Sequence, residues 1–451
     1  MGLDFTTGPV MPLLLRFFLP FLLANVLNSL YNTVDTIVIG HFVGSNGIVA
    51  VNMGGKMLEM FSMVGIAVAG GGQTLIAQLT GSKRREDISR TIGTLFTFLL
   101  IMSMLTAAVM LIFAKPVLTL LNTPEESFLQ ALQYLRITCI GLPLLFGYTA
   151  VSAILRGMGD SKSPLIYIAI AATFNLIGDI VFVAVFHMGA AGTAIATVMG
   201  QGISLVFSLV RLYSKRESFG FDFRIKSFAI SAEKLKIIIR LGFPMALRGF
   251  FIKVTQLGMF GFINDYGLTQ AAAYSIGDKI YRLANVFVMS VTQAGSGMIG
   301  QNIGADRRDR VKPIMKCVFA MSMGFALLIS AVALLFPKQI YGLFTSDPAV
   351  ISYAPRFMAI CCLIFIACAI MGTYDGVVTG TGASMLSFLG GFLDGVLFRI
   401  TLSLLFAWVF DMGIEGFFLG EAMARLGPII VGMIYYHSGA WLKKKKLVES
   451  M

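Results

Sequence analysis

The sequence predicts an all-α polytopic membrane protein, with twelve transmembrane helices arranged as two parallel six-helix repeats. Three observations predict this fold. Of the 451 residues, 57% are hydrophobic and only 13% are charged, about half the roughly 25% usual in soluble domains. Apolar stretches of about 20 residues, each long enough to cross roughly 30 Å of hydrocarbon, recur along the chain. The sequence also aligns with itself when it is shifted by 223 residues.

Twelve apolar stretches are the candidate spans. In chain order they cover residues 12–38, 48–76, 92–114, 130–153, 165–187, 190–213, 238–263, 271–300, 314–336, 352–376, 386–410 and 413–436. A membrane β-barrel would show shorter segments of alternating polarity, so helices are expected. The composition excludes a set of soluble domains, a disordered chain, a disulfide scaffold and a soluble nucleic-acid binder.

Lysine and arginine in the loops predict the orientation. One side carries 24 of the 35 basic residues, mainly in 83–90, in 211–240 and in the tail at 443–446, whereas the loops of the other side carry only Lys115 and Lys338. Because basic loops stay in the cytoplasm, both termini are expected there. This topology signal accounts for the net charge of +12, so no nucleic-acid partner is expected and the partner surface is the lipid bilayer.

The internal repeat predicts the organisation of the chain. Matching segments are 44–57 with 267–280, 77–87 with 300–310, 155–161 with 378–384 and, at a shift of 224, 187–192 with 411–416. An even number of spans in each half makes the repeats parallel. The predicted domains are an N-terminal lobe (1–213), a cytoplasmic linker (214–237), a C-terminal lobe (238–437) and a basic cytoplasmic tail (438–451). Duplicated lobes of this kind bind substrate between the halves and alternate access.

Polar side chains within the first-half spans mark a candidate ion site. The first span places four of them on one stripe: Asn25, Asn28, Asn32 and Asp35. The fifth span adds Asn175 and Asp179, one turn apart. Charged groups inside a membrane are costly and are usually functional, so we interpret these residues as a site for H⁺ or Na⁺. The alternative is that the acids only tie helices together.

The second half carries a different set of charges. Its spans hold six bases, Arg248, Lys253, Lys279, Arg282, Arg399 and Arg425, and four acids, Asp278, Asp375, Asp394 and Glu421. The positive excess predicts that substrates carry an anionic or zwitterionic group held by Arg248, Lys253, Arg282 or Arg399. Internal ion pairing is the alternative, in particular for Glu421 and Arg425, which are four residues apart.

Other sites and cofactors are not expected. The five cysteines and three histidines have no metal-ligand spacing, and no nucleotide-binding loop or nucleophile motif is present, so we expect neither an enzyme nor a cofactor. Pro20 removes a backbone hydrogen bond from the first span and could let it bend as a gate. A static kink is the alternative.

The chain resembles the multidrug and toxic compound extrusion (MATE) family. The resemblance rests on the order and spacing of Pro20 with DTIVIGHFVG (35–44), LRGMGDSKSP (155–164), NLIGD (175–179) and MGAAGTAIA (188–196). It implies a V-shaped pair of lobes and secondary antiport driven by H⁺ or Na⁺. It also implies a first-lobe ion site at Asp35, Asn175 and Asp179, with Thr197 as a weaker match. A second-lobe Na⁺ site is not expected, because the seventh span offers no acid to accompany Asp375.

The expected function is therefore an antiporter that exports small amphipathic organic compounds or drugs. Asn28, Asn32 and Asp375 complete the expected substrate cavity, together with the four bases named above. The first alternative is a flippase for lipid-linked precursors from the same superfamily, although such flippases usually have fourteen spans. The second is a channel or a non-transporting scaffold. The expected location is a bacterial inner membrane, and the expected oligomeric state is a monomer.

Overall fold

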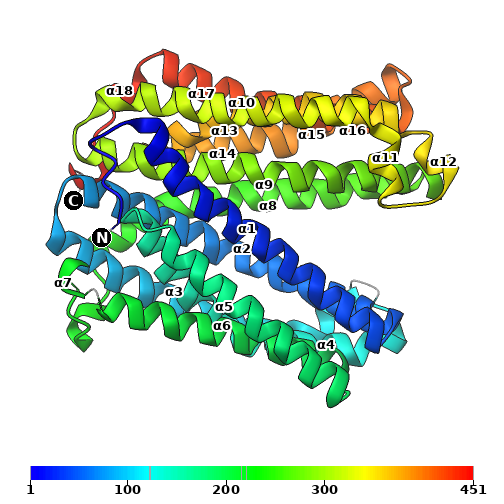
Figure 1. Cartoon of the computed structure of the whole chain (residues 1–451), viewed down its shortest axis with the longest axis horizontal. Helices are drawn as coiled ribbons and strands as arrows, with labels where there is room; N and C mark the ends of the chain where they lie inside the picture. The colour runs from blue at the N-terminus through cyan, green and yellow to red at the C-terminus, as the bar shows by residue number, and fades with distance from the viewer. Residues whose placement is uncertain (1, 121–122, 215, 220, 450–451) are drawn as a thin grey trace. The chain divides into compact units, whose positions relative to one another are not determined.

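The computed structural model describes residues 2–120, 123–214, 216–219 and 221–449; at positions 31, 32, 120, 218, 219 and 448 it describes the backbone alone. Helices make up nearly all of these ranges, and no strand occurs within them. The predicted all-helical class is confirmed. Figure 1 follows the chain from α1, in blue, to α17 and α18, in red.

Six long helical segments form the first half of the chain. They are α1 (Val10–Phe42), α2 (Ser45–Gly81), α3 (Arg85–Leu120), α4 (Glu125–Gly157), α5 (Lys162–Asp179) with its π-helical continuation η1 (Ile180–Val185), and α6 (Gly189–Ser214). The connection to the second half contains the short helices α7 (Arg216–Phe219) and η2 (Ile225–Phe228). Each of the six long segments overlaps one predicted span.

Six further long segments form the second half. They are α8 (Ala232–Asn264), α9 (Leu268–Gly304), α10 (Val311–Leu335), α13 (Ala354–Gly380), the composite α14–η4–α15–η5 (Ser384–Phe392, Leu393–Phe398, Arg399–Leu404, Leu405–Val409), and α16–α17 (Gly413–Ala424, Leu426–His437). Short helices are η3 (Arg308–Arg310), α11 (Pro337–Gly342), α12 (Pro348–Ile351), α18 (Ala440–Lys443) and η6 (Leu447–Glu449). In the described residues, ten long segments are apolar enough to span a membrane, and the two others, α8 and α9, carry several of the intramembrane charges.

The chain packs as two compact units. Unit 1 contains residues 2–4 and 19–243, and unit 2 contains 5–18 and 244–449. The first turns of α1 therefore pack with the second half, and the first turns of α8 pack with the first half. Pro20 in α1 and Pro244 in α8 lie within two residues of two of the three positions where the described chain passes from one unit to the other.

The backbone repeats as the sequence does. Left-handed residues pair at a shift of 223 for Gly44 and Gly267, Lys83 and Asp306, and Gly159 and Gly382, and at a shift of 224 for His187 and Asp411, and Gly189 and Gly413. The π-helical η1 and η5 also coincide at a shift of 224. The two halves therefore share local geometry as well as sequence, which supports the internal repeat.

Small residues let the helices of unit 2 approach closely. A Cβ atom at Gly420 in α16 would lie 2.4 Å from the backbone of Ser403, and one at Gly416 would lie 2.5 Å from the backbone of Ala407. Because lipid is as apolar as the helix surfaces, van der Waals packing through small residues is a main source of helix association in membranes. These glycines therefore set the contact of α16 with α15 and η5.

We expect Gly420→Ala to destabilise the protein by about 1–3 kcal/mol, since the added methyl group meets backbone that cannot rotate away. Gly324→Ala is the matched control, because a Cβ atom at Gly324 in α10 would have open space around it. Alanine also has a higher helix propensity than glycine, since it restricts the unfolded backbone. The control should be neutral or stabilising by up to about 1 kcal/mol. Thermal unfolding of the purified proteins checks both; equal melting temperatures would contradict the packing argument.

Candidate functional site

Four predicted residues of unit 1 lie together inside the helix bundle. Asp35 comes from α1, Asn175 and Asp179 come from α5, and Thr197 comes from α6. All four are buried, with exposed fractions between 0% for Asp179 and 4% for Asp35 and Thr197. Three helices thus bring two acids, an amide and a hydroxyl into one enclosed polar site.

Local helix geometry positions the two α5 side chains. Asn175 and Asp179 are four residues apart and share one face of the helix. Directly after Asp179 the regular helix gives way to the π-helical segment η1, a deviation that is frequent at functional sites. The left-handed residues His187 and Gly189 then turn the chain into α6, which supplies Thr197.

Asp35 accepts hydrogen bonds from two neighbours. The Asn175 amide is best oriented with its nitrogen toward Asp35, where it donates to Oδ1 at 2.8 Å while its oxygen accepts from the Thr197 backbone N–H at 3.3 Å. The Thr197 hydroxyl donates to Asp35 Oδ2 at 3.4 Å. These contacts fix the carboxyl group of Asp35 in one orientation.

Asp179 has a different environment. Its carboxyl group contacts that of Asp35, and no N–H or O–H group of the described residues donates to either of its oxygens. Two buried carboxylates in contact repel each other when both are ionised. The pair therefore requires either a shared proton or a small cation between its oxygens. Carboxylate, amide and hydroxyl oxygens are suitable ligands for a hard cation such as Na⁺.

Tyr134 belongs to the same site, although the sequence analysis did not identify it. This α4 residue is buried and lies within electrostatic range of both Asp35 and Asp179. Gly54 of α2 makes room for its ring, since a Cβ there would lie 2.4 Å from Tyr134 Cδ1. A single tyrosine in an apolar span gives no sequence signal of its own, so only the packing of α2 against α4 identifies it.

In unit 2 the intramembrane charges are mostly paired. Arg248 Nη1 lies 2.7 Å from Asp375 Oδ1, and Arg282 Nε lies 2.7 Å from Asp278 Oδ2. Arg399 bridges two acids, as described below. Ion pairs therefore neutralise three of the four bases expected to hold substrate, which weakens the basis for expecting anionic substrates.

The most deeply buried pairs form one network around Glu421. Arg399 Nη1 lies 2.5 Å from Glu421 Oε1, and Arg399 Nη2 lies 2.9 Å from Asp394 Oδ1. The Tyr274 hydroxyl donates to Glu421 Oε2 at 2.9 Å. Arg425 also contacts Glu421, at 3.8 Å, so the predicted Glu421–Arg425 neighbour pair is present. The network joins α9, α15, α16 and η4.

The remaining residues of the expected substrate cavity are dispersed. Arg282 and Arg399 line a cavity of about 10 Å³, which holds roughly one water molecule and no organic substrate. Arg248 and Asp375 do not line it. Asn28 and Lys253 have exposed side chains, and the side chain of Asn32 lies outside the described part of the structure. Substrate binding by these residues therefore stays a prediction.

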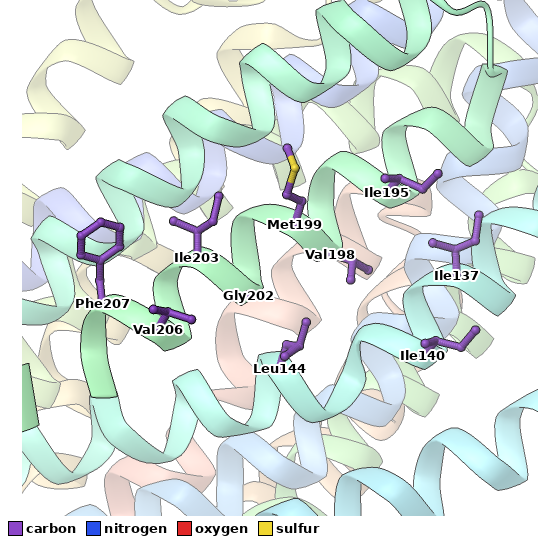
Figure 2. A pocket seen from close by; sticks show the side chains of 10 residues that line it. All are labelled: Ile137, Ile140, Leu144, Ile195, Val198, Met199, Gly202, Ile203, Val206 and Phe207. Atoms are coloured by element: carbon purple, nitrogen blue, oxygen red, sulfur yellow. The ribbon is translucent and has the colours of Figure 1, made fainter. Parts of the chain in front are cut away.

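An apolar groove of unit 1 lies between α4 and α6 (Figure 2). Its volume is about 580 Å³, and ten residues line it: Ile137, Ile140, Leu144, Ile195, Val198, Met199, Gly202, Ile203, Val206 and Phe207. Ile140 and Val206 are more than half exposed. A ligand site normally includes a few polar groups that orient the ligand, and this groove has none. We interpret it as a surface that contacts lipid chains.

Comparisons with known proteins agree with this architecture. The chain is 26% identical over 452 residues to a protein of Bacillus subtilis described as probable multidrug resistance protein YpnP, with 99% of each chain covered. It is 25% identical over 453 residues to the probable multidrug resistance protein NorM of Thermotoga maritima, covering 97% of this chain and 94% of that one. A solved outward-facing multidrug resistance MATE family transporter of the MOP superfamily superposes with a TM-score of 0.91 at 19% identity, over 98% and 99% of the two chains.

The match to a family profile is the most specific comparison. The MatE profile matches residues 20–181 and again residues 244–405, one match in each half of the chain. Each match begins at one of the two prolines near the unit boundaries, Pro20 and Pro244. The two matches cover most of the chain and reproduce its internal repeat. The chain therefore belongs to the MatE family of multi-pass membrane transporters.

Proposed function

We propose that this transporter exports small amphipathic organic compounds in exchange for H⁺ or Na⁺, and that the coupling ion binds at Asp35 and Asp179. The observation that carries the proposal is the buried carboxyl pair in which Asp179 has no hydrogen-bond donor among the described residues. If the acid pair had only a structural role, we would expect protein side chains to donate hydrogen bonds to both acids. Glu421 in unit 2 has such donors, Arg399 and Tyr274. Relatives described as multidrug resistance proteins support the substrate class.

The mechanism follows from how the ion changes the acid pair. Without a cation or proton, the carboxylates of Asp35 and Asp179 repel each other. A cation or proton bound between them attracts both carboxylates, and this attraction draws α1 toward α5. Because Pro20 removes a backbone hydrogen bond from α1, that helix can bend when Asp35 moves. Linkage then requires the ion and the substrate to favour opposite conformations.

The distribution of basic residues supports a location in a bacterial inner membrane with both termini in the cytoplasm. The loops on the side of the termini carry the basic groups 83–90 and 307–316 and the tail at 443–446, as the positive-inside rule requires. The second lobe is expected to add no Na⁺ site, because Asp375 is already paired with Arg248. The protein is expected to act as a monomer.

The test is dye transport by the purified protein in proteoliposomes under an imposed H⁺ or Na⁺ gradient. We would offer the cation ethidium, a zwitterionic fluoroquinolone and the anion carboxyfluorescein. We expect gradient-dependent movement of the cation or the zwitterion, driven by one of the two ions, and little movement of the anion because the arginines of unit 2 are paired. Transport that is indifferent to both gradients would refute ion-coupled export.

A further inference from the structure

We infer that the second half contains the counterpart of the first-half ion site, and that the guanidinium group of Arg399 permanently occupies the place of the coupling ion there. The counterpart is thus a site with a tethered cation, which takes no ion from solution. The comparison with the first half rests on the proposed ion site at Asp35 and Asp179. The ion pairs of Arg399 do not depend on that proposal.

The register between the two halves identifies the counterpart residues. His187 and Gly189 coincide in backbone conformation with Asp411 and Gly413, which fixes a shift of 224 for this part of the repeat. The same shift superposes η1 on η5, on the N-terminal side of these turns. Three residues of the first-half site then have defined partners: Asn175 corresponds to Arg399, Asp179 to Ser403 and Thr197 to Glu421.

The counterpart residues meet in the second half as their partners do in the first. Arg399, Ser403 and Glu421 line one small cavity. Met259 also lines it and follows Gly258, the residue 223 positions after Asp35. The composition of the site has been changed in a coordinated way. The two acids of the first half are replaced by apolar and neutral residues, whereas the amide and the hydroxyl are replaced by a base and an acid.

The geometry around Arg399 is that of a bound cation. One nitrogen lies 2.5 Å from Glu421 Oε1 and another lies 2.9 Å from Asp394 Oδ1. Arg399, Asp394 and Glu421 are all at most 5% exposed. An arginine cannot lose its proton under physiological conditions, so this positive charge is present in every state of the transport cycle.

The neighbouring charges leave no vacancy for a second cation. The other charged groups at the site are also paired: Arg425 contacts Glu421, and Arg282 pairs with Asp278. The Tyr274 hydroxyl donates to Glu421, and α8 contributes the uncharged residues Gln256, Met259 and Phe260. Three bases therefore face three acids. The cavity of about 10 Å³ leaves room for roughly one water molecule. The second half is thus held in the equivalent of an ion-loaded state, and ion exchange is confined to the first half.

The first experiment empties the tethered site. Arg399→Ala leaves a cavity flanked by Asp394 and Glu421, and we expect millimolar methylguanidinium to raise the melting temperature of this variant in a saturable manner. NaCl at the same concentration should have a much smaller effect. Arg356→Ala is the matched control, because Arg356 forms an exposed ion pair with Glu415, and it should show no saturable response. A variant that responds no more than the control would overturn the inference.

A second pair of variants covers the case in which Arg399→Ala does not fold. Arg399→Lys keeps a tethered cation, whereas Arg399→Met has similar length and no charge. We expect the lysine variant to retain most of the monodisperse yield and melting temperature, and the methionine variant to lose both. Equal behaviour of the two would show that the charge of Arg399 is dispensable and would overturn the inference.

The reciprocal change, Asn175→Arg, introduces a tethered cation into the first half. We expect this variant to fold and to lose any stabilisation of the wild type by H⁺ or Na⁺, because the guanidinium group then occupies the acid pair. Retained ion-dependent stabilisation would contradict the equivalence of the two sites. Failure of the proposed ion site is distinguishable, since a wild type without ion dependence would leave the methylguanidinium response of Arg399→Ala intact.

Discussion

Asp35→Asn and Asp179→Asn are each expected to reduce gradient-driven export by about 10- to 100-fold, the range of a typical coupling free energy between two ligands. The asparagine side chain keeps the size of the acid but carries no charge that a proton or Na⁺ can neutralise. Because the two carboxyl groups contact each other, removing either one abolishes the repulsion that a bound ion relieves. The measurement is dye flux in proteoliposomes with and without an ion gradient.

The control for this prediction is Glu126→Gln, which changes an exposed acid at the start of α4 in the same unit. It should transport as the wild type does. Both asparagine variants should still bind the dye, since the loss lies in coupling and the fold is intact. Gradient-driven transport that survives in both variants would place the coupling ion elsewhere in the molecule.

Glu421→Gln is expected to destabilise the protein by about 3–5 kcal/mol, the cost of breaking a buried ion pair by removing one partner. Glu421 accepts hydrogen bonds from Arg399 and Tyr274 and also contacts Arg425, all buried. The amide keeps the shape of the side chain but leaves the guanidinium groups with one negative charge fewer. Unfolding in a graded denaturing detergent measures the change.

Glu415→Gln provides the comparison within the same helix, because its partner Arg356 is 72% exposed. An exposed pair contributes about 0–1 kcal/mol, so this variant should unfold almost as the wild type does. A similar loss in both variants would indicate that the Glu421 network has no special role. A large loss at Glu421 alone supports the view that the network is a permanent structural element of the second half.

Hydropathy and the internal repeat predict most of the fold. Each predicted span overlaps one long helical segment, because twenty consecutive apolar residues have few alternatives to a helix in a membrane. The repeat at a shift of 223 appears again in the left-handed turns, where a glycine such as Gly44 or Gly267 adopts a positive φ without steric cost. Sequence and backbone geometry therefore report the same duplication.

The composition of the sites is only partly predictable. The grouping of Asp35, Asn175 and Asp179 follows from helical spacing and from the family motifs, but the absence of a described donor at Asp179 emerges only from packing. The charges of the second half suggest a basic cavity when they are counted along the chain. Contacts between distant helices, such as Arg248 with Asp375, turn that excess into pairs. A count of charges contains no information on which helices touch.

The passage of the chain between the two units was also not evident from hydropathy. Residues 5–18 pack in unit 2 because Phe5 is fully buried there and its backbone exchanges hydrogen bonds with the side chains of Gln301 and Asn302. These are backbone contacts of Phe5, in the stretch that precedes the first predicted span. Sequence patterns describe the polarity of such a segment but not its docking surface.

The most direct test of the central claim is the release of the coupling ion when substrate binds. Ethidium would be added to the purified protein in weakly buffered detergent solution, and the appearance of H⁺ or Na⁺ would be recorded for the wild type, Asp35→Asn and Asp179→Asn. The proposed mechanism predicts that the wild type releases one of the two ions and that neither variant does. Release that is unchanged in both variants would show that Asp35 and Asp179 do not hold the coupling ion.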